Sequence, residues 1–103
     1  MKNVYSDQVQ ITQITPETIL AQAAFHISER ARTYDKPEGE RSMSATIAAF
    51  NAITGHNLTE AQGWLFMVLL KAVRAFQREG YHADSIEDMA AYVALMGEAK
   101  ARE

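Results

Sequence analysis

The residues best suited to chemistry form a basic group followed by an acidic one. Lys71, Arg74 and Arg78 are spaced i, i+3 and i+7, so they would lie along one side of a helix. Arginine offers a planar fork of donors and lysine a point charge, and both suit a phosphate group. The same spacing is also typical of a solvated helix face. Lys71 and Arg74 are therefore candidate ligand-binding residues.

Two aspartates follow at a spacing that suits a metal ion. Asp84 and Asp88 are four residues apart, so a helix would present both carboxylates on one face, where they could hold a hard cation such as Mg²⁺. Tyr92 lies one turn further along and joins the candidate ligand-binding group. The structural alternative is that Asp84 caps the helix, since acidic residues are favoured at helix N-termini.

A third polar group stands before an expected loop. Glu29, Arg30 and Tyr34 are candidate ligand-binding residues because segments that follow helices often carry binding groups. The alternative is an ordinary charged helix end. The chain has no Walker loop, dinucleotide fingerprint, HExxH or nucleophile elbow, which excludes the recognisable kinase, dehydrogenase, zinc-protease and esterase classes.

Composition narrows the protein class further. The 103 residues fit one domain, 48% are hydrophobic, and the formal net charge of −3 predicts no binding to duplex nucleic acid. The absence of cysteine suits a reducing compartment, and no apolar leader is visible, so we expect the cytoplasm. The apolar run Trp64 to Leu70 is too short to span a membrane.

Local signals predict an arm and four helices. Residues 1–14 show only a brief alternation and are expected to form an extended arm, with a helical domain over 15–103. Capping and stop signals place the helices at about 16–32, 42–53, 60–78 and 84–98. Tyr34 to Glu40 contains a proline and a glycine and is predicted to be a loop.

The helix ends carry the clearest signals. Thr59 and Gln62 form a capping-box pattern, and Asp84 with Glu87 forms a second one. Gly55 and Gly80 follow helical segments and are natural left-handed stops.

These elements predict an all-α, four-helix bundle-like domain. The segment 64–76 is too apolar for a surface helix, and a chain of this length has a modest core, so we expect a homo-oligomer, most simply a dimer. The short connection before Asp84 predicts that the last two helices are antiparallel. That arrangement would set Asp84 level with Arg78 and Asp88 level with Arg74 to within about one turn, with Tyr92 near Lys71.

Three segments resemble an uncharacterised family of small phage and prophage proteins. They read ERARTYDKPEGE, LLKAVR and HADSIEDMAAYVALMGE, within residues 22–98. The family positions fall on Glu29, Arg30, Tyr34, Pro37, Lys71, Arg74, Asp84, Ser85, Asp88 and Tyr92. The chain departs from that pattern at Asp35, where a glycine is usual, and at Gly39, where an asparagine is expected. The resemblance implies a phage origin and no particular reaction.

A more distant likeness is to the MazG-like all-α nucleotide pyrophosphohydrolases, which use Mg²⁺ held by helix carboxylates. Their E-E-x-x-E and E-x-x-D signature is absent here. The leading hypothesis is a phage-encoded helical oligomer that binds a nucleotide or other phosphorylated small molecule with Mg²⁺. The alternative is a non-enzymatic interaction protein that docks on a host or phage partner and uses the same charges to fix helix register.

Overall fold

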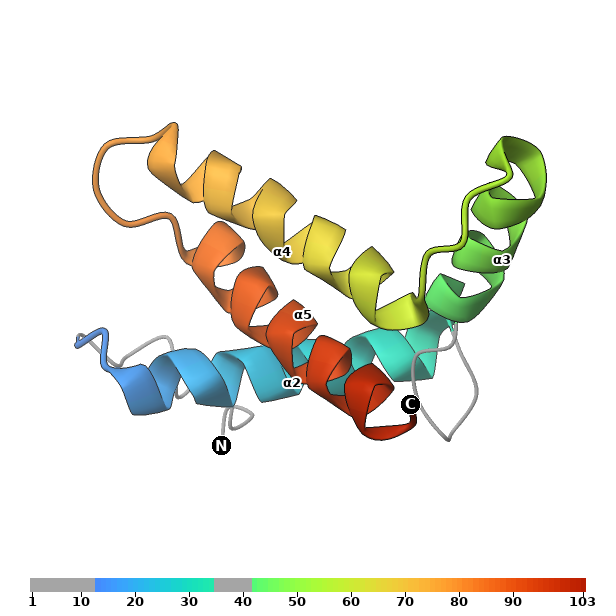
Figure 1. The fold of residues 1–103 in the computed structure, drawn as a ribbon. Helices are drawn as coiled ribbons and strands as arrows, with labels where there is room; N and C mark the ends of the chain where they lie inside the picture. Colours follow the sequence, from blue (N-terminus) through green and yellow to red (C-terminus); the bar gives the residue numbers. More distant parts are fainter. Residues whose placement is uncertain (1–12, 35–41) are drawn as a thin grey trace.

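The computed structural model describes residues 13–34 and 42–103, which form four helices and no strand (Figure 1). The helices are α2 (Pro16–Tyr34), α3 (Ser42–Thr54), α4 (Glu60–Phe76) and α5 (Ala83–Ala101). The predicted all-α class is confirmed for these ranges. Of the predicted arm, residues 1–12 lie outside the described residues, as does 35–41 of the predicted loop.

The beginning of α4 has the predicted cap. The Thr59 hydroxyl accepts a hydrogen bond from the Gln62 amide at 3.1 Å, and the Gln62 side chain accepts one from the Thr59 amide at 2.9 Å. Gly55 follows α3 directly with a φ angle of 77°, which confirms this left-handed stop. Gly80 also has a positive φ angle of 76°, but it lies in the turn beyond the end of α4 and does not itself stop that helix.

The cap predicted for α5 is wrong. The N-cap is His82, and α5 begins at Ala83, so Asp84 lies inside the first turn and its side chain does not cap the helix. Its charge can still complement the positive end of the helix dipole. Glu87, the expected second member of that box, instead lies 2.8 Å from Nε2 of His26 on α2.

Three other helix boundaries also differ from the prediction. α2 ends at Tyr34, which was predicted to begin the loop, rather than near Arg32. α4 ends at Phe76 rather than near Arg78, and α5 continues to Ala101 rather than fraying from Glu98. Arg102 secures this end, since its guanidinium lies 2.9 Å from Glu60 at the beginning of α4 and 3.4 Å from Glu98. The contact with Glu60 joins the end of α5 to the beginning of α4.

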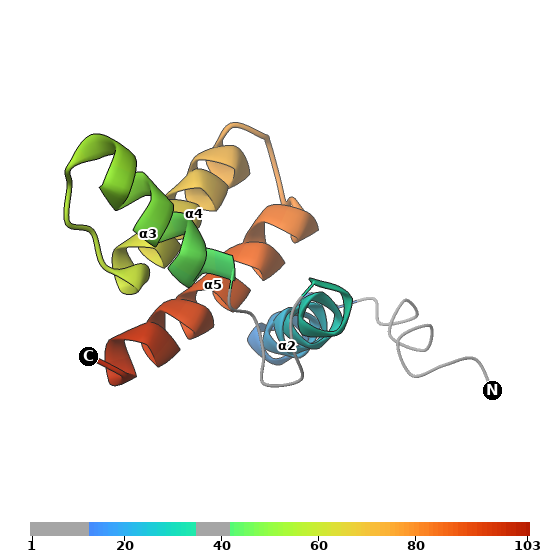
Figure 2. The ribbon, with the colours of Figure 1, turned by 90° about the vertical axis from the view of Figure 1, so that its right-hand side faces the viewer.

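The helices pack in a row rather than around one shared core. α4 and α5 run antiparallel, α2 crosses α5, and α3 packs on α4 (Figure 1). Within the described ranges, the backbone of α3 comes close to that of α4 and not to that of α2 or α5, and Figure 2 shows α3 on the far side of the α4–α5 pair from α2. The arrangement is therefore an open one. None of the described helices has the length and apolar character needed to cross a membrane.

The core lies between α4 and α5. Trp64 and Tyr92 are buried and stack with ring centroids 5.6 Å apart at 25°, and Leu95 is buried beside them. Small residues such as Ala61 and Ala99 complete this cluster and let the helices approach closely. Trp64 is thus a core residue.

α3 approaches α4 at a glycine. A Cβ atom added to Gly63 would lie 2.5 Å from Sδ of Met43 and 2.9 Å from Cδ1 of Ile47, both on α3. No described residue of α3 is buried. The absence of a side chain at Gly63 therefore permits the observed contact between these two helices.

Candidate functional site

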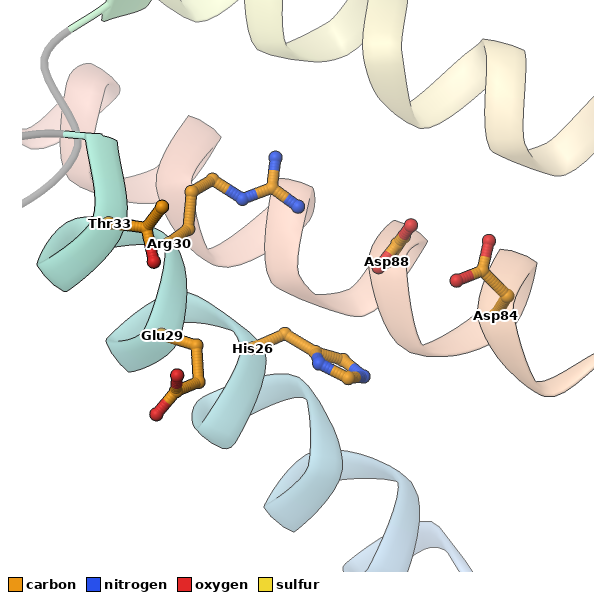
Figure 3. A pocket seen from close by; sticks show the side chains of 6 residues that line it. All are labelled: His26, Glu29, Arg30, Thr33, Asp84 and Asp88. Carbon is orange, nitrogen blue, oxygen red and sulfur yellow. The ribbon is translucent and has the colours of Figure 1, made fainter.

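An open cavity of about 310 Å³ lies between α2 and α5 (Figure 3). It is lined by six polar residues, His26, Glu29, Arg30, Thr33, Asp84 and Asp88. The first four are spaced i, i+3, i+4 and i+7 on α2, which places them on one helix face. The structure therefore brings four of the predicted site residues together, namely Glu29, Arg30, Asp84 and Asp88.

His26 and Thr33 were not among the residues predicted to form this site. Their spacing with Glu29 and Arg30 was a signal that could have found them, because all four share one face of α2. His26 reaches across to α5, where its Nε2 lies 2.8 Å from Oε1 of Glu87. This contact ties α2 to α5 beside the cavity.

Lys71 lies behind the two aspartates. Its ammonium group is 2.8 Å from Oδ2 of Asp88 and 3.4 Å from Oδ2 of Asp84. Lys71 and Asp88 are nearly buried, with 10% and 13% of their side chains exposed, whereas Asp84 is 66% exposed. Burial by itself lowers the pKa of Lys71, but the hydrogen bond and charge of Asp88, followed by those of Asp84, outweigh it, so the pKa is raised above 10.5.

The contacts between α4 and α5 are displaced from the predicted register by one turn at Asp88 and by two turns at Tyr92. Asp88 pairs with Lys71 rather than lying level with Arg74, and Tyr92 stacks on Trp64. The reason is the position of the chain reversal. Because α4 ends at Phe76 and α5 begins at Ala83, residues equally distant from these two ends become neighbours.

Arg30 extends from α2 over Tyr92. Its Nη1 donates a hydrogen bond to the Tyr92 hydroxyl at 3.2 Å, and its guanidinium carbon lies 5.3 Å from the centre of the ring. With Trp64 behind Tyr92, three helices contribute to one stack of side chains. Arg30 is thereby held at the wall of the cavity, in the direction of α5 (Figure 3).

The remaining predicted site residues are placed differently. Glu29 pairs with Arg32, and its carboxylate is turned away from the two aspartates in Figure 3. Arg74 is exposed on α4 and does not line the cavity, and neither does Lys71. Tyr34 is the last residue of α2, and its side chain is not among those described. The phosphate-binding role of Lys71 and Arg74 stays a prediction.

A second cavity of about 290 Å³ lies at the turn between α4 and α5. Arg78, Tyr81 and His82 are among its lining residues. His82 uses Nδ1 to contact the Ser85 hydroxyl at 2.6 Å, and Ser85 is fully buried. Burial, followed by the negative charge of Glu87, raises the pKa of the Tyr81 hydroxyl. This cavity shares no lining residue with the first.

Asp84 and Asp88 are the residues of the first cavity that could take part in holding a cation. Among the described residues, no group of three or more His, Cys, Asp or Glu side chains is placed to hold a metal ion. Mg²⁺ usually binds one or two protein carboxylates together with substrate phosphates and water. Lys71 contacts the Oδ2 atoms of Asp84 and Asp88, so the two Oδ1 atoms are the ones to consider for such a cation.

A family model described as a domain of unknown function, DUF6378, matches residues 18–100. No curated protein and no solved structure matches the chain. The family match includes all four described helices apart from their outermost residues. The chain therefore belongs to the DUF6378 family.

Proposed function

We propose that this member of the DUF6378 family binds a nucleotide or another phosphorylated small molecule in the cavity between α2 and α5. The supporting observation is that cationic and anionic side chains from two helices line the same open cavity. Arg30 provides donors for a phosphate group on one wall. Asp84 and Asp88 provide carboxylates on the other, where a metal–phosphate ligand needs them.

The Tyr92 ring supports the role of Arg30. An arginine that stacks on an aromatic ring has fewer conformations to lose when it binds an anion. Arg30 replaces Lys71 and Arg74 as the preferred phosphate contact, because Lys71 is enclosed by carboxylates and Arg74 lies outside the cavity.

The proposal assigns Mg²⁺ to the cavity side of Asp84 and Asp88. When bound there, the ion would neutralise phosphate charge and polarise the phosphoryl group, which is the chemistry that a hydrolytic reaction requires. Lys71 would hold Asp88 in place from behind, through its 2.8 Å contact. Asp84 is the more accessible of the two carboxylates and would make the first contact with an arriving cation.

The proposal is tested by thermal unfolding with a panel of nucleotides, each with and without Mg²⁺. A ligand present at about a hundred times its Kd adds about 2.7 kcal/mol to the free energy of unfolding. For a domain of this size, such a gain raises Tm by roughly 10 °C. We expect this increase to require both the nucleotide and Mg²⁺.

Four variants locate the response. Arg30→Gln and Asp84→Asn should each remove most of the increase in Tm, measured from the variant's own baseline. Glu79→Gln changes an exposed acidic residue outside the cavity and should keep it. Two results would show that the cavity is not the binding site. One is that no ligand raises Tm; the other is that Arg74→Gln removes the increase while Arg30→Gln keeps it.

A second candidate function is favoured by the contacts of Lys71. Both aspartates engage this one ammonium group, which is the arrangement expected if the charges only fix the register of α4 against α5. The protein would then be a non-enzymatic interaction protein that docks on a host or phage partner. It should fold equally well and show no ligand-dependent change in Tm.

The proposed setting is the cytoplasm of a bacterial cell that carries the phage or prophage, with the protein acting as a homodimer. The resemblance of the three motif segments supports the phage origin. The lack of cysteine suits a reducing compartment. The small buried core supports self-association, because α4–α5 packing buries only a few large side chains among the described residues.

A further inference from the structure

We infer that α4 pairs antiparallel with α4 of a second copy of this chain, through the face formed by Phe66, Leu69, Val73 and Phe76. This inference deepens the proposed homodimer by assigning its interface and geometry. It does not depend on the proposed ligand, whose cavity lies between α2 and α5. We call these four residues the α4 seam.

The α4 seam is exposed although it is entirely hydrophobic. Phe66 and Phe76 are 69% and 88% exposed, and Leu69 and Val73 are each 55% exposed. The opposite side of the same helix is buried, with Trp64, Lys71 and Ala75 turned toward the rest of the fold. α4 therefore has two packing faces, of which α5 covers one.

The spacing of the α4 seam is that of a helix–helix interface. Its residues follow one another at intervals of three, four and three, which is the repeat that keeps apolar side chains facing a partner helix. Lys71 projects from the opposite side, and Arg74 lies beside the seam rather than within it. A neighbouring helix would thus meet an uninterrupted apolar strip.

The exposed apolar area of the seam supplies a large part of what an interface covers. Two phenylalanines at these exposures leave on the order of 300 Å² of aromatic surface. The two aliphatic residues of the seam and Leu65, which is 43% exposed, extend this patch. Single apolar patches on monomers usually reach only about 300–600 Å², and a stable interface covers about 800 Å² on each partner.

The order of residues points to a second copy of the chain as the occupant. Read in either direction, the α4 seam presents a phenylalanine, two aliphatic residues and a phenylalanine at the same intervals. A two-fold axis through its middle therefore maps the seam onto itself, as a closed symmetric dimer requires. Phe66 would face the partner's Phe76, and Leu69 would face the partner's Val73.

The antiparallel register follows from the residues that flank the seam. A shift by seven residues would place Phe76 over the partner's Thr59 and Val73 over the partner's Gln62. Both of these are polar residues that form the cap of α4. The unshifted register matches apolar to apolar along the whole seam, so it is the one we assign.

The first test measures mass in solution by analytical ultracentrifugation over a range of concentrations. The unmodified chain should be dimeric, and Leu69→Glu and Phe76→Glu should each raise the dissociation constant about a hundredfold or more. Leu20→Glu places the same charge on an equally exposed residue of α2, 62% exposed, and should leave the dimer intact. Circular dichroism checks that each variant is folded.

The second test determines the orientation of the helices and uses the absence of cysteine in the chain. Phe66→Cys and Phe76→Cys chains are prepared separately and treated with a short bifunctional maleimide. In the assigned register, ten residues separate a cysteine from its copy in the partner, or roughly 15 Å along the helix. Only the mixture of the two variants should therefore cross-link efficiently.

Three outcomes would overturn the inference. If the chain is monomeric at all concentrations, a second copy does not cover the α4 seam, and a different protein would have to be its partner. A dimer that persists in Leu69→Glu and Phe76→Glu would have its interface elsewhere, and cross-linking of each cysteine variant alone would indicate parallel helices. The ligand response of a folded monomeric variant is measured separately, so failure of the interface and failure of the ligand proposal are distinguishable.

Discussion

The Lys71 ammonium group lies 2.8 Å from the Asp88 carboxylate, in a place where both side chains are nearly closed to solvent. α4 supplies the cation and α5 the anion, so this pair fixes one helix against the other. Removing either member would leave a buried charge without its main partner, which costs more than the net contribution of the pair. The exposed Asp84 contributes less to stability because water screens it.

Lys71→Met should therefore lower the free energy of unfolding by about 2–4 kcal/mol. Asp84→Asn, which changes the exposed partner, should lower it by less than about 1 kcal/mol. Both values come from urea unfolding followed by circular dichroism. The double variant Lys71→Met/Asp88→Leu should recover much of this loss of stability, because neither charge is left buried without its partner. A loss in the double variant equal to the summed losses of Lys71→Met and Asp88→Leu would contradict the pairing.

Stability should decrease at alkaline pH. The folded-state pKa values of Lys71 and Tyr81 are both raised, so the folded state holds these protons more tightly than the unfolded chain. Their contribution is complete below the ordinary pKa values of 10.5 and 10.0 and is lost as pH rises through the raised values. Urea unfolding at a series of pH values from about pH 9 upward measures the decrease, which begins near the ordinary pKa values of the two groups.

Two variants separate the contributions to this pH dependence. Lys71→Met and Tyr81→Phe each remove one titrating group, so each should flatten the decrease above pH 10 relative to the unmodified chain. An unchanged slope in both variants would show that other groups cause the loss.

A matched pair of glycine substitutions tests the contact between α3 and α4. Gly63→Ala should lower the free energy of unfolding by about 1–2 kcal/mol, because the added methyl group must displace Met43 and Ile47. Gly97→Ala in α5 adds a methyl group where nothing lies within 4 Å and should raise the value by about 0.5–1 kcal/mol, owing to helix propensity alone. Equal stabilisation in both variants would contradict close packing at Gly63.

Local signals predicted the helices more reliably than their contacts. The capping box of Thr59 and Gln62 and the stop at Gly55 depend on residues a few positions apart, and both appear as expected. The pairing of Lys71 with Asp88 depends on where the chain reverses between α4 and α5. A difference of two residues at the end of α4 contributed to moving the partner of Asp88 by one turn, from Arg74 to Lys71.

The faces of α4 could not be assigned from the sequence, for a different reason. Its apolar residues surround most of the helix, so the pattern does not say that α5 covers Trp64 and leaves Phe66 exposed. Nor does any local signal show that α2 crosses α5 and brings His26 to Glu87. The spacing of the polar residues of α2 indicates that they share one helix face, but it does not indicate that this face packs against α5.

The packing of the helices in a row has a consequence for how the protein opens. Because α3 is attached through α4 alone among the described helices, its backbone amides can exchange with solvent through a local fluctuation that leaves the other three helices assembled. Hydrogen–deuterium exchange should therefore label α3 well before the centre of α4 and α5. Simultaneous labelling would mean that the whole chain opens as a single cooperative unit.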